Sequence, residues 1–197
     1  SPVPIYLDGG NFFSTGHYCL TSSMDFAPRA DEVSSARLET RPSVYTLKEK
    51  YSRDIGCDEL IIVQNPPHEH LDMWLKPVSE STVLVSELED KSLAVLRDQF
   101  GYIPSQYLEL QSLLNKKAQE LSAYFHVDRL PMPLPYRGGF RNYTNSILVN
   151  GVAVVPSFTR FGWNYDDYPD AKLKSYYERK VEKIYRRHGF KVRFANA

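Results

Sequence analysis

The chain has 197 residues, of which 42% are hydrophobic and 24% are charged. A chain of this length can bury one sizeable hydrophobic core or form part of a larger fold. Its 24 basic and 24 acidic residues cancel, so no global charge directs it to nucleic acid or an anionic membrane, and no apolar run reaches the ~18 residues of a membrane span.

The first part of the chain predicts two strands, a helix and a returning strand. Its expected elements are, in order, a strand at 5–7, a turn or bulge at 8–11, a strand at 17–21, a loop or short irregular helix over 24–42, a helix from 43 to about 53 and a buried strand at 59–64. The turn is indicated by Gly9-Gly10, because glycine tolerates the backbone angles of tight turns. In the predicted helix, Val44, Leu47 and Tyr51 fall on one face.

The same order of elements follows twice more. In the second copy the expected elements are a strand at 70–78, a turn at 79–81, a strand at 82–88, a long helix opened by Pro104 and Ser105, and a strand at about 127–134. In the third copy they are strands at 146–150 and 152–158, a loop over 159–169, a helix from about 170 that ends at Gly189, and a strand at 191–194. The strands of the third copy are joined by Asn150-Gly151, the strongest hairpin signal in the sequence.

The three copies start near residues 8, 70 and 144, so one supersecondary unit repeats with a period of roughly 65 residues. Repetition of this kind favours units arranged around an axis, each packed on its neighbour. Three copies would leave exposed strand edges, which indicates part of a larger ring of α/β units. A compact three-unit α+β domain is the alternative that the pattern leaves open.

The strongest candidates for chemistry are His70 and Asp72. A strand over 70–78 would place His70, Asp72 and Trp74 on one face, because side chains alternate along a strand. An imidazole and a carboxylate held side by side can receive a cation and transfer protons near neutral pH. The alternative is a strand end whose polar face meets solvent.

Three segments resemble the peptidylarginine deiminase family. They are Leu7-Asp8-Gly9-Gly10-Asn11, His70-Leu71-Asp72-Met73-Trp74-Leu75-Lys76 and Tyr143-Thr144-Asn145-Ser146-Ile147-Leu148-Val149-Asn150. The resemblance spans nearly the whole chain and is strongest for the bacterial Porphyromonas-type branch, followed by the agmatine deiminases. It implies the pentein fold of the guanidino-group-modifying superfamily, a five-bladed α/β propeller. Residues 1–197 would then form a single incomplete domain with units at about 5–64, 70–134 and 144–195.

The resemblance also implies a reaction and four site residues. The family's enzymes hydrolyse a guanidinium to a ureido group and ammonia, which is citrullination when the substrate is peptidyl-arginine, and they use a cysteine thiolate. By resemblance, His70 is the general acid and base, Asp72 binds the guanidinium, and Asn145 orients the substrate or its neighbours. Asp8 would support the histidine, although an aspartate that caps the Gly-Gly turn is the alternative for it.

The nucleophile expected from the family is a cysteine beyond Ala197, so the chain by itself is expected to be inactive. The two cysteines present, Cys19 and Cys57, lie in apolar contexts, which favours buried free thiols over a disulfide. A non-catalytic binding or scaffolding fragment of the same fold is the alternative function. A second alternative pairs Cys19 or Cys57 with His70 in a hydrolase of another class.

The expected partner is a guanidinium substrate, either peptidyl-arginine or a small molecule such as agmatine. Neither nucleic acid nor a membrane is expected, whereas the rest of the same polypeptide or a homo-oligomer is a further candidate partner. No organic cofactor is needed and no metal site is expected; calcium, which part of the family binds, would have only the acidic loop 165–167. For Arg137 and Arg141 a surface-loop role is favoured over reaching the mouth of the site. Export is consistent with the resemblance to a secreted branch.

Overall fold

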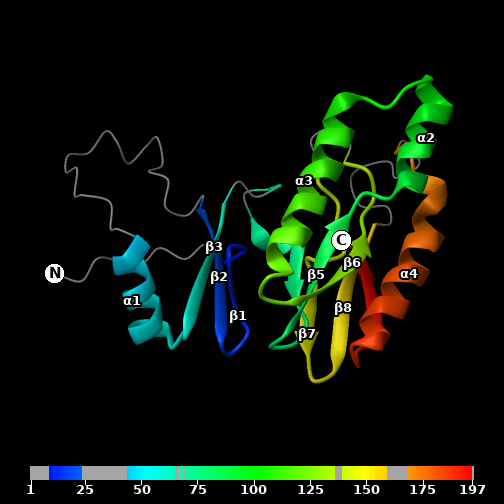
Figure 1. Ribbon diagram of the computed structural model, residues 1–197. Coiled ribbons are helices and arrows are strands. Elements are labelled where there is room, and N and C mark those ends of the chain that lie inside the picture. Colours follow the sequence, from blue (N-terminus) through cyan, green and yellow to red (C-terminus); the bar gives the residue numbers. More distant parts are fainter. Residues whose placement is uncertain are drawn as a thin grey trace, which may run out of the picture. The chain divides into compact units, whose positions relative to one another are not determined.

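A computed structural model describes residues 9–23, 44–64, 67–68, 70–135, 139–158 and 168–196. The chain divides into two compact units, an N-terminal unit of Ser1–Leu71 and a C-terminal unit of Asp72–Ala197. The described strands form three separate three-stranded sheets (Figure 1). The mixed α/β class predicted from the repeat is confirmed.

The N-terminal unit holds the first sheet. Its elements are β1 (Phe12–Ser14), β2 (Tyr18–Ser22), α1 (Val44–Ile55) and β3 (Glu59–Val63). β2 lies in the middle, antiparallel to β1 and parallel to β3. The strand expected at 5–7 lies outside the described residues, and the strand that pairs with β2 follows the Gly9-Gly10 turn instead of preceding it.

A disulfide joins Cys19 and Cys57 within the core of this unit. The prediction that both cysteines are free thiols is therefore wrong. The parallel pairing of β2 with β3 brings the two Cα atoms to 5.6 Å, a separation that suits a disulfide. Both cysteines are buried, and they pack with Tyr51 and Leu60. The two cysteines are 38 positions apart in the sequence, so local patterns could not predict that they meet.

The C-terminal unit holds the second and third sheets. The second is formed by β4 (Leu75–Pro77), β5 (Thr82–Glu87) and β6 (His126–Pro131), with α2 (Asp90–Phe100) and α3 (Ser105–Leu121) between β5 and β6. The third is formed by β7 (Ile147–Val149), β8 (Val152–Ser157) and β9 (Lys191–Asn196), with η5 (Ala171–Leu173) and α4 (Lys174–Arg187) before β9. In both sheets the first two strands are antiparallel and the last two are parallel, which matches the first sheet.

Two local predictions have clear outcomes. Asn150 and Gly151 have positive φ angles of 48° and 73°, as the two-residue hairpin between β7 and β8 requires. The strand predicted over 70–78 is wrong in its first half, because a 3-10 turn, η3 (Leu71–Met73), precedes β4. Leu71, Trp74 and Leu75 are all fully buried, a spacing that a helical turn satisfies and an alternating strand does not. His70, Asp72 and Trp74 therefore do not share a strand face.

The core of the C-terminal unit joins its two sheets. The fully buried residues of this core include Leu84, Leu130, Tyr143, Ala153, Val155, Tyr177, Val181 and Tyr185. α3 packs along β5 and β6, and α4 packs against both β6 and β9 (Figure 1). Because α4 contacts both sheets, its buried face fixes the second sheet relative to the third.

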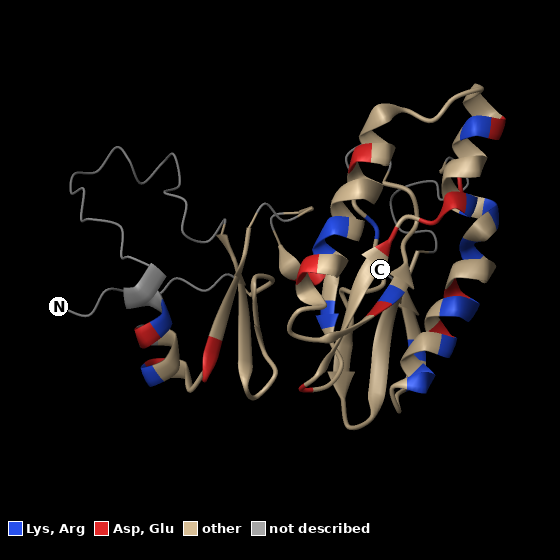
Figure 2. Ribbon diagram, in the orientation of Figure 1, with Lys and Arg blue, Asp and Glu red and all other residues tan. Residues whose placement is uncertain are grey.

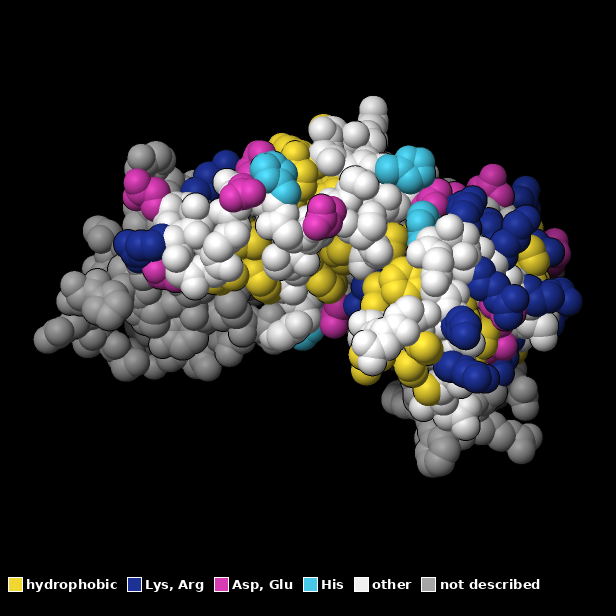
Figure 3. Space-filling model, turned by 90° about the horizontal axis from the view of Figure 1, so that it is seen from below, with side chains coloured by type: hydrophobic (Ala, Val, Ile, Leu, Met, Phe, Trp, Pro, Cys, Tyr) yellow, Lys and Arg dark blue, Asp and Glu magenta, His cyan; other side chains and the backbone are white. Residues whose placement is uncertain are grey.

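Charge is unevenly distributed over this unit. α4 carries six Lys or Arg residues and two Glu residues in the sequence KSYYERKVEKIYRR, and its basic positions are coloured blue on the ribbon in Figure 2. Figure 3 shows basic side chains gathered over the side of the C-terminal unit where α4 lies. The formal net charge of zero thus conceals a local excess of positive charge along α4. Among the described helices, none combines the length and apolar character needed to cross a membrane.

Candidate functional site

The C-terminal unit brings two of the three sequence motifs into contact. The hydroxyl of Thr144 donates to the main-chain carbonyl of Asp72 over 3.0 Å. The side-chain amides of Asn142 and Asn145 lie 3.4 and 3.6 Å from the sulfur of Met73, as donors to a weak acceptor. The turn that carries Asn145 therefore lies against the segment that carries Asp72.

This turn, residues 142–146, is stabilised from within. The Oδ1 atom of Asn142 accepts the main-chain N–H of Asn145 over 2.7 Å and lies 2.8 Å from the hydroxyl of Thr144, an arrangement typical of Asn-capped turns. Asn142 and Thr144 are buried, at 3% and 0% exposure, whereas Asn145 is exposed. The buried members can hold the backbone while the Asn145 amide stays accessible.

Lys76 and Tyr185 hold the far end of the same turn. The Nζ atom of Lys76 donates to the carbonyl of Ser146 over 2.6 Å. Burial lowers the pKa of Lys76, and the nearby Asp72 carboxylate opposes that shift, so the ammonium and the carboxylate interact. From α4, the hydroxyl of Tyr185 lies 2.8 Å from the Ser146 hydroxyl and donates to the carbonyl of Tyr143 over 3.0 Å.

The N-terminal unit holds a related contact between the first and second motifs. The side-chain oxygen of Asn11, from the Gly-Gly-Asn turn, accepts the main-chain N–H of Leu71 over 3.0 Å. The N–H of His70 donates to Nδ1 of His68 over 3.2 Å, and the two rings are 6.1 Å apart. Asn11 is 3% exposed. The Gly-Gly-Asn turn is thus tied directly to the residue that follows His70.

The four predicted site residues have different outcomes. Asp72 and Asn145 lie in the C-terminal unit, where they share Met73 and Thr144 as neighbours. His70 belongs to the N-terminal unit, and Asp8 lies outside the described residues. The chemical roles of all four stay predictions.

Sequence reasoning assigned no role to Asn11, Lys76, Asn142 or Thr144. Three of these four residues lie inside the quoted motifs and Asn142 directly precedes one. The available signal was a polar side chain beside strongly apolar positions, as at Lys76 after Leu75. A buried polar group needs a hydrogen-bond partner, but its partner at another motif cannot be read from local spacing.

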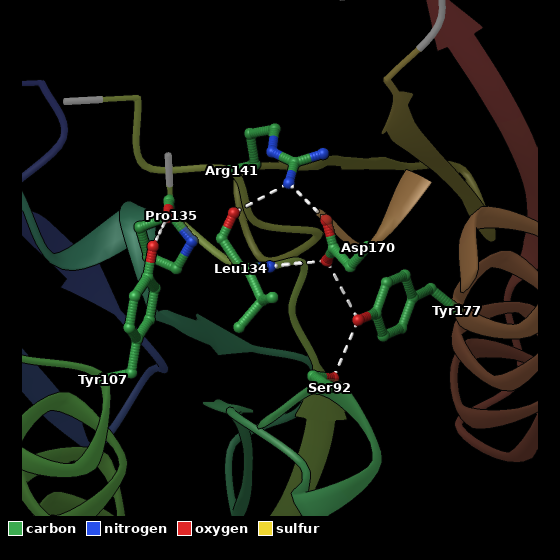
Figure 4. A network of polar contacts seen from close by, with 7 residues as sticks. All are labelled: Ser92, Tyr107, Leu134, Pro135, Arg141, Asp170 and Tyr177. Carbon is green, nitrogen blue, oxygen red and sulfur yellow. Dashed lines mark hydrogen bonds and ion pairs between the residues drawn. The ribbon is translucent and has the colours of Figure 1, made fainter. Parts of the chain in front are cut away.

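Arg141 begins a second polar network, and its expected surface role is wrong. Its side chain is 7% exposed, and one terminal nitrogen lies 2.8 Å from Oδ1 of the fully buried Asp170. The same nitrogen donates to the carbonyl of Leu134 over 2.7 Å (Figure 4). A guanidinium is buried in a protein only where a carboxylate can pair with it. The partner of Arg141 is Asp170, which lies 29 positions away, so the local sequence predicted a surface loop instead. Arg137 lies outside the described residues.

Metal binding has no support within the described ranges, where no three His, Cys, Asp or Glu side chains are grouped as metal ligands. The acidic loop 165–167 lies outside those ranges, so calcium binding there stays a prediction. Neither finding bears on the need for an organic cofactor.

No protein-family model and no curated protein matches the sequence. Solved structures do match. An agmatine deiminase from C. jejuni superposes with a TM-score of 0.56 at 20% identity, over 99% of this chain and 51% of the enzyme. An agmatine deiminase from Enterococcus faecalis gives a TM-score of 0.61 at 13% identity, over 95% and 51%. A Porphyromonas gingivalis protein provisionally assigned as an arginine deiminase gives a TM-score of 0.60 at 16% identity, over 96% of this chain and 51% of that protein.

The fold of this chain is similar to that of about half of a deiminase. Its structural neighbours are the agmatine and Porphyromonas-type deiminases that the three motifs resemble. At 13–20% identity the likeness establishes the fold alone. The chain spans about half the length of these deiminases.

Proposed function

We propose that the protein is a deiminase-type hydrolase that converts a guanidinium into a ureido group and ammonia. The observation that carries this proposal is the hydrogen bond from Thr144 to the carbonyl of Asp72, since it unites a carboxylate-bearing segment with the turn that carries Asn145. The deiminase fold of the neighbours supports the same reaction class. The three similar sheets would be three blades of a five-bladed propeller.

In this proposal Asp72 binds the substrate. A guanidinium is a planar fork of N–H donors, and a carboxylate accepts two of them in parallel. The exposed amide of Asn145 orients the bound group, while the ammonium of Lys76 interacts with the Asp72 carboxylate and favours its ionised form.

His70 transfers the protons in the proposed mechanism. A cysteine thiolate attacks the guanidinium carbon, a C–S bond forms, and the C–N bond to the leaving ammonia breaks as His70 supplies its proton. His70 then takes a proton from water, whose oxygen attacks the same carbon and releases the thiolate. Asp8 supports the imidazole in its orientation.

The thiolate in this mechanism is supplied by a cysteine outside these 197 residues. The chain contains two cysteines, and Cys19 and Cys57 are bonded to each other, so neither is a thiolate. The alternative in which one of them attacks a substrate beside His70 is therefore wrong for this oxidised state. The 197 residues on their own are then inactive.

The substrate is proposed to be agmatine or peptidyl-arginine. The C. jejuni agmatine deiminase is known with its substrate bound, which makes agmatine the first compound to test. The decisive experiment measures ammonia release by the intact protein with agmatine, arginine and an arginine-containing peptide. Both His70→Ala and Asp72→Asn are compared with His126→Ala, in which the replaced imidazole is 71% exposed.

The expected loss for His70→Ala is roughly 10²–10⁴-fold in kcat/KM, the usual contribution of a general acid and base. His126→Ala should keep the wild-type rate. Unchanged turnover in His70→Ala would remove the histidine from the mechanism, and no ammonia from any of the three substrates would contradict the proposed reaction.

The disulfide favours one second candidate, a non-catalytic module that binds guanidinium compounds. With both cysteines bonded, the chain can hold a cation at Asp72 without attacking it. Titration calorimetry with agmatine separates the two functions. A binding module binds agmatine and releases no ammonia from the intact protein, and Asp72→Asn abolishes that binding.

A further inference from the structure

The buried network around Asp170 connects the segment after β6 with α4 and α2. The Oδ2 atom of Asp170 accepts the main-chain N–H of Leu134, just after β6, over 2.7 Å. It also accepts the hydroxyl of Tyr177, on α4, over 3.0 Å. The Tyr177 hydroxyl in turn lies 2.7 Å from the hydroxyl of Ser92 on α2 (Figure 4). Asp170, Leu134, Tyr177 and Ser92 are all fully buried.

Arg141 attaches to this frame from one side. Its guanidinium carbon lies 3.7 Å from the centroid of the Tyr168 ring, in addition to the contacts of one terminal nitrogen with Asp170 and Leu134. A buried guanidinium cannot shift without losing partners that water does not replace. The position of Arg141 is therefore determined by Asp170, whose carboxylate is held directly by Leu134 after β6 and by Tyr177 on α4.

The main chain passes directly from Arg141 into the turn over 142–146. Asn142 begins that turn and supplies the oxygen that accepts the N–H of Asn145. Thr144, two residues further, reaches the carbonyl of Asp72. An anchored Arg141 thus fixes the start of the turn, and the turn fixes the segment that bears the carboxylate.

We propose that Arg141 and Asp170 are positioning residues, which hold the turn over 142–146 and, through Thr144, the Asp72 segment in the geometry that receives a guanidinium. This inference rests on the proposed function for its catalytic consequence. Neither residue touches the substrate. Their effect on the reaction passes through the placement of Asn145 and Asp72, and a displacement of about 1 Å at such groups lowers rates by up to about 10²-fold.

The variant that tests this role is Arg141→Lys, in the intact protein. Lysine keeps the positive charge but lacks the planar fork of donors that reaches a carboxylate and a carbonyl together. The matched control is Ser92→Ala, which removes a buried hydroxyl from the same network. Ser92 bonds only to Tyr177 in this network and is therefore separated from Arg141 by Tyr177 and Asp170. Should Arg141→Lys fail to fold, Asp170→Asn takes its place, because it keeps the shape of the side chain.

The first measurement is hydrogen exchange at the amides of Asn145 and Ser146, both of which donate within the turn. Exchange is expressed relative to amides of β8 in the same molecule, so that general destabilisation cancels. We expect Arg141→Lys to raise this relative exchange at least about tenfold, as loss of a hydrogen bond to a charged group implies. Ser92→Ala should leave it unchanged. Equal relative exchange in both variants overturns the proposal.

The second measurement is the rate of ammonia release. We expect Arg141→Lys to lower kcat/KM by roughly 10–10²-fold and Ser92→Ala to keep the wild-type value. Wild-type kcat/KM in Arg141→Lys overturns the positioning role in catalysis. A wild-type protein that releases no ammonia overturns the proposed reaction instead, and in that case the exchange measurement still decides whether Arg141 and Asp170 hold the turn.

Discussion

The hydroxyl of Thr144 donates a hydrogen bond of 3.0 Å to the carbonyl of Asp72, which lies 72 positions earlier in the chain. Its single proton is shared with the Oδ1 atom of Asn142, at 2.8 Å. Thr144 is fully buried, so its hydroxyl is out of reach of water. One hydroxyl group therefore links the start of the second repeat to the start of the third.

Thr144→Val should destabilise the C-terminal unit by about 1–3 kcal/mol, because it keeps the shape of the side chain and removes the hydroxyl that donates to the carbonyl of Asp72. Thr144→Ser keeps the hydroxyl and serves as the control. Urea denaturation of the two variants provides the comparison. If valine and serine lowered the free energy of unfolding equally, the hydroxyl would not be the group that matters.

Asn11→Ala removes the side-chain oxygen that accepts the main-chain N–H of Leu71. Because a buried donor is then left without an acceptor, the free energy of unfolding should fall by about 1–3 kcal/mol. Asn11→Asp retains an oxygen at the same place, so the amide of Leu71 should keep its acceptor and its wild-type exchange relative to neighbouring amides, while the buried carboxylate lowers the overall stability. Hydrogen exchange at the Leu71 amide gives a direct readout. Unaltered exchange at that amide in Asn11→Ala would show that another acceptor suffices.

Removal of the disulfide should lower the stability of the N-terminal unit. The bond closes a loop with a sequence separation of 38, and native disulfides of this kind contribute about 2–4 kcal/mol. The test compares denaturation of the wild type with and without a reducing agent, beside the double variant Cys19→Ala/Cys57→Ala. The reducing agent should destabilise the wild type and have no effect on the double variant. A response in both would point to another cause.

Stability should depend on alkaline pH through Lys76. Burial lowers the pKa of this lysine in the folded protein, whereas the unfolded chain keeps the ordinary value of 10.5. Between the lowered pKa and 10.5 the unfolded state binds more protons, so the free energy of unfolding rises with pH across that interval. Lys76→Met removes the titrating group. The free energy of unfolding of the wild type should therefore rise relative to that of Lys76→Met as the pH approaches 10.5. A difference between the two proteins that does not change with pH would contradict the lowered pKa of Lys76.

Local patterns predicted most of the repeat correctly. The Asn150-Gly151 hairpin, the helix from Ser105 and the strand from Thr82 all appear near their expected places, because turn residues and apolar periodicity act over a few positions. α2 received no assignment, although Leu93 and Leu96 are buried at helical spacing and Gly101 ends it with a φ of 78°. The prediction of a strand that begins at His70 was wrong because the few residues of this segment are compatible both with period-two alternation and with a short 3-10 turn.

The candidate site divides in the same way. The sequence by itself supplied the candidate residues, since His70, Asp72 and Asn145 were selected from motifs alone, and their chemical roles stay predictions. Only the tertiary structure decided that Cys19 bonds to Cys57, that Arg141 pairs with Asp170, and that Thr144 reaches Asp72. Each of these contacts joins residues from different elements, and their distance depends on which strands pair and which helix covers them. Short-range preferences encode the elements, whereas the burial of a whole core selects their partners.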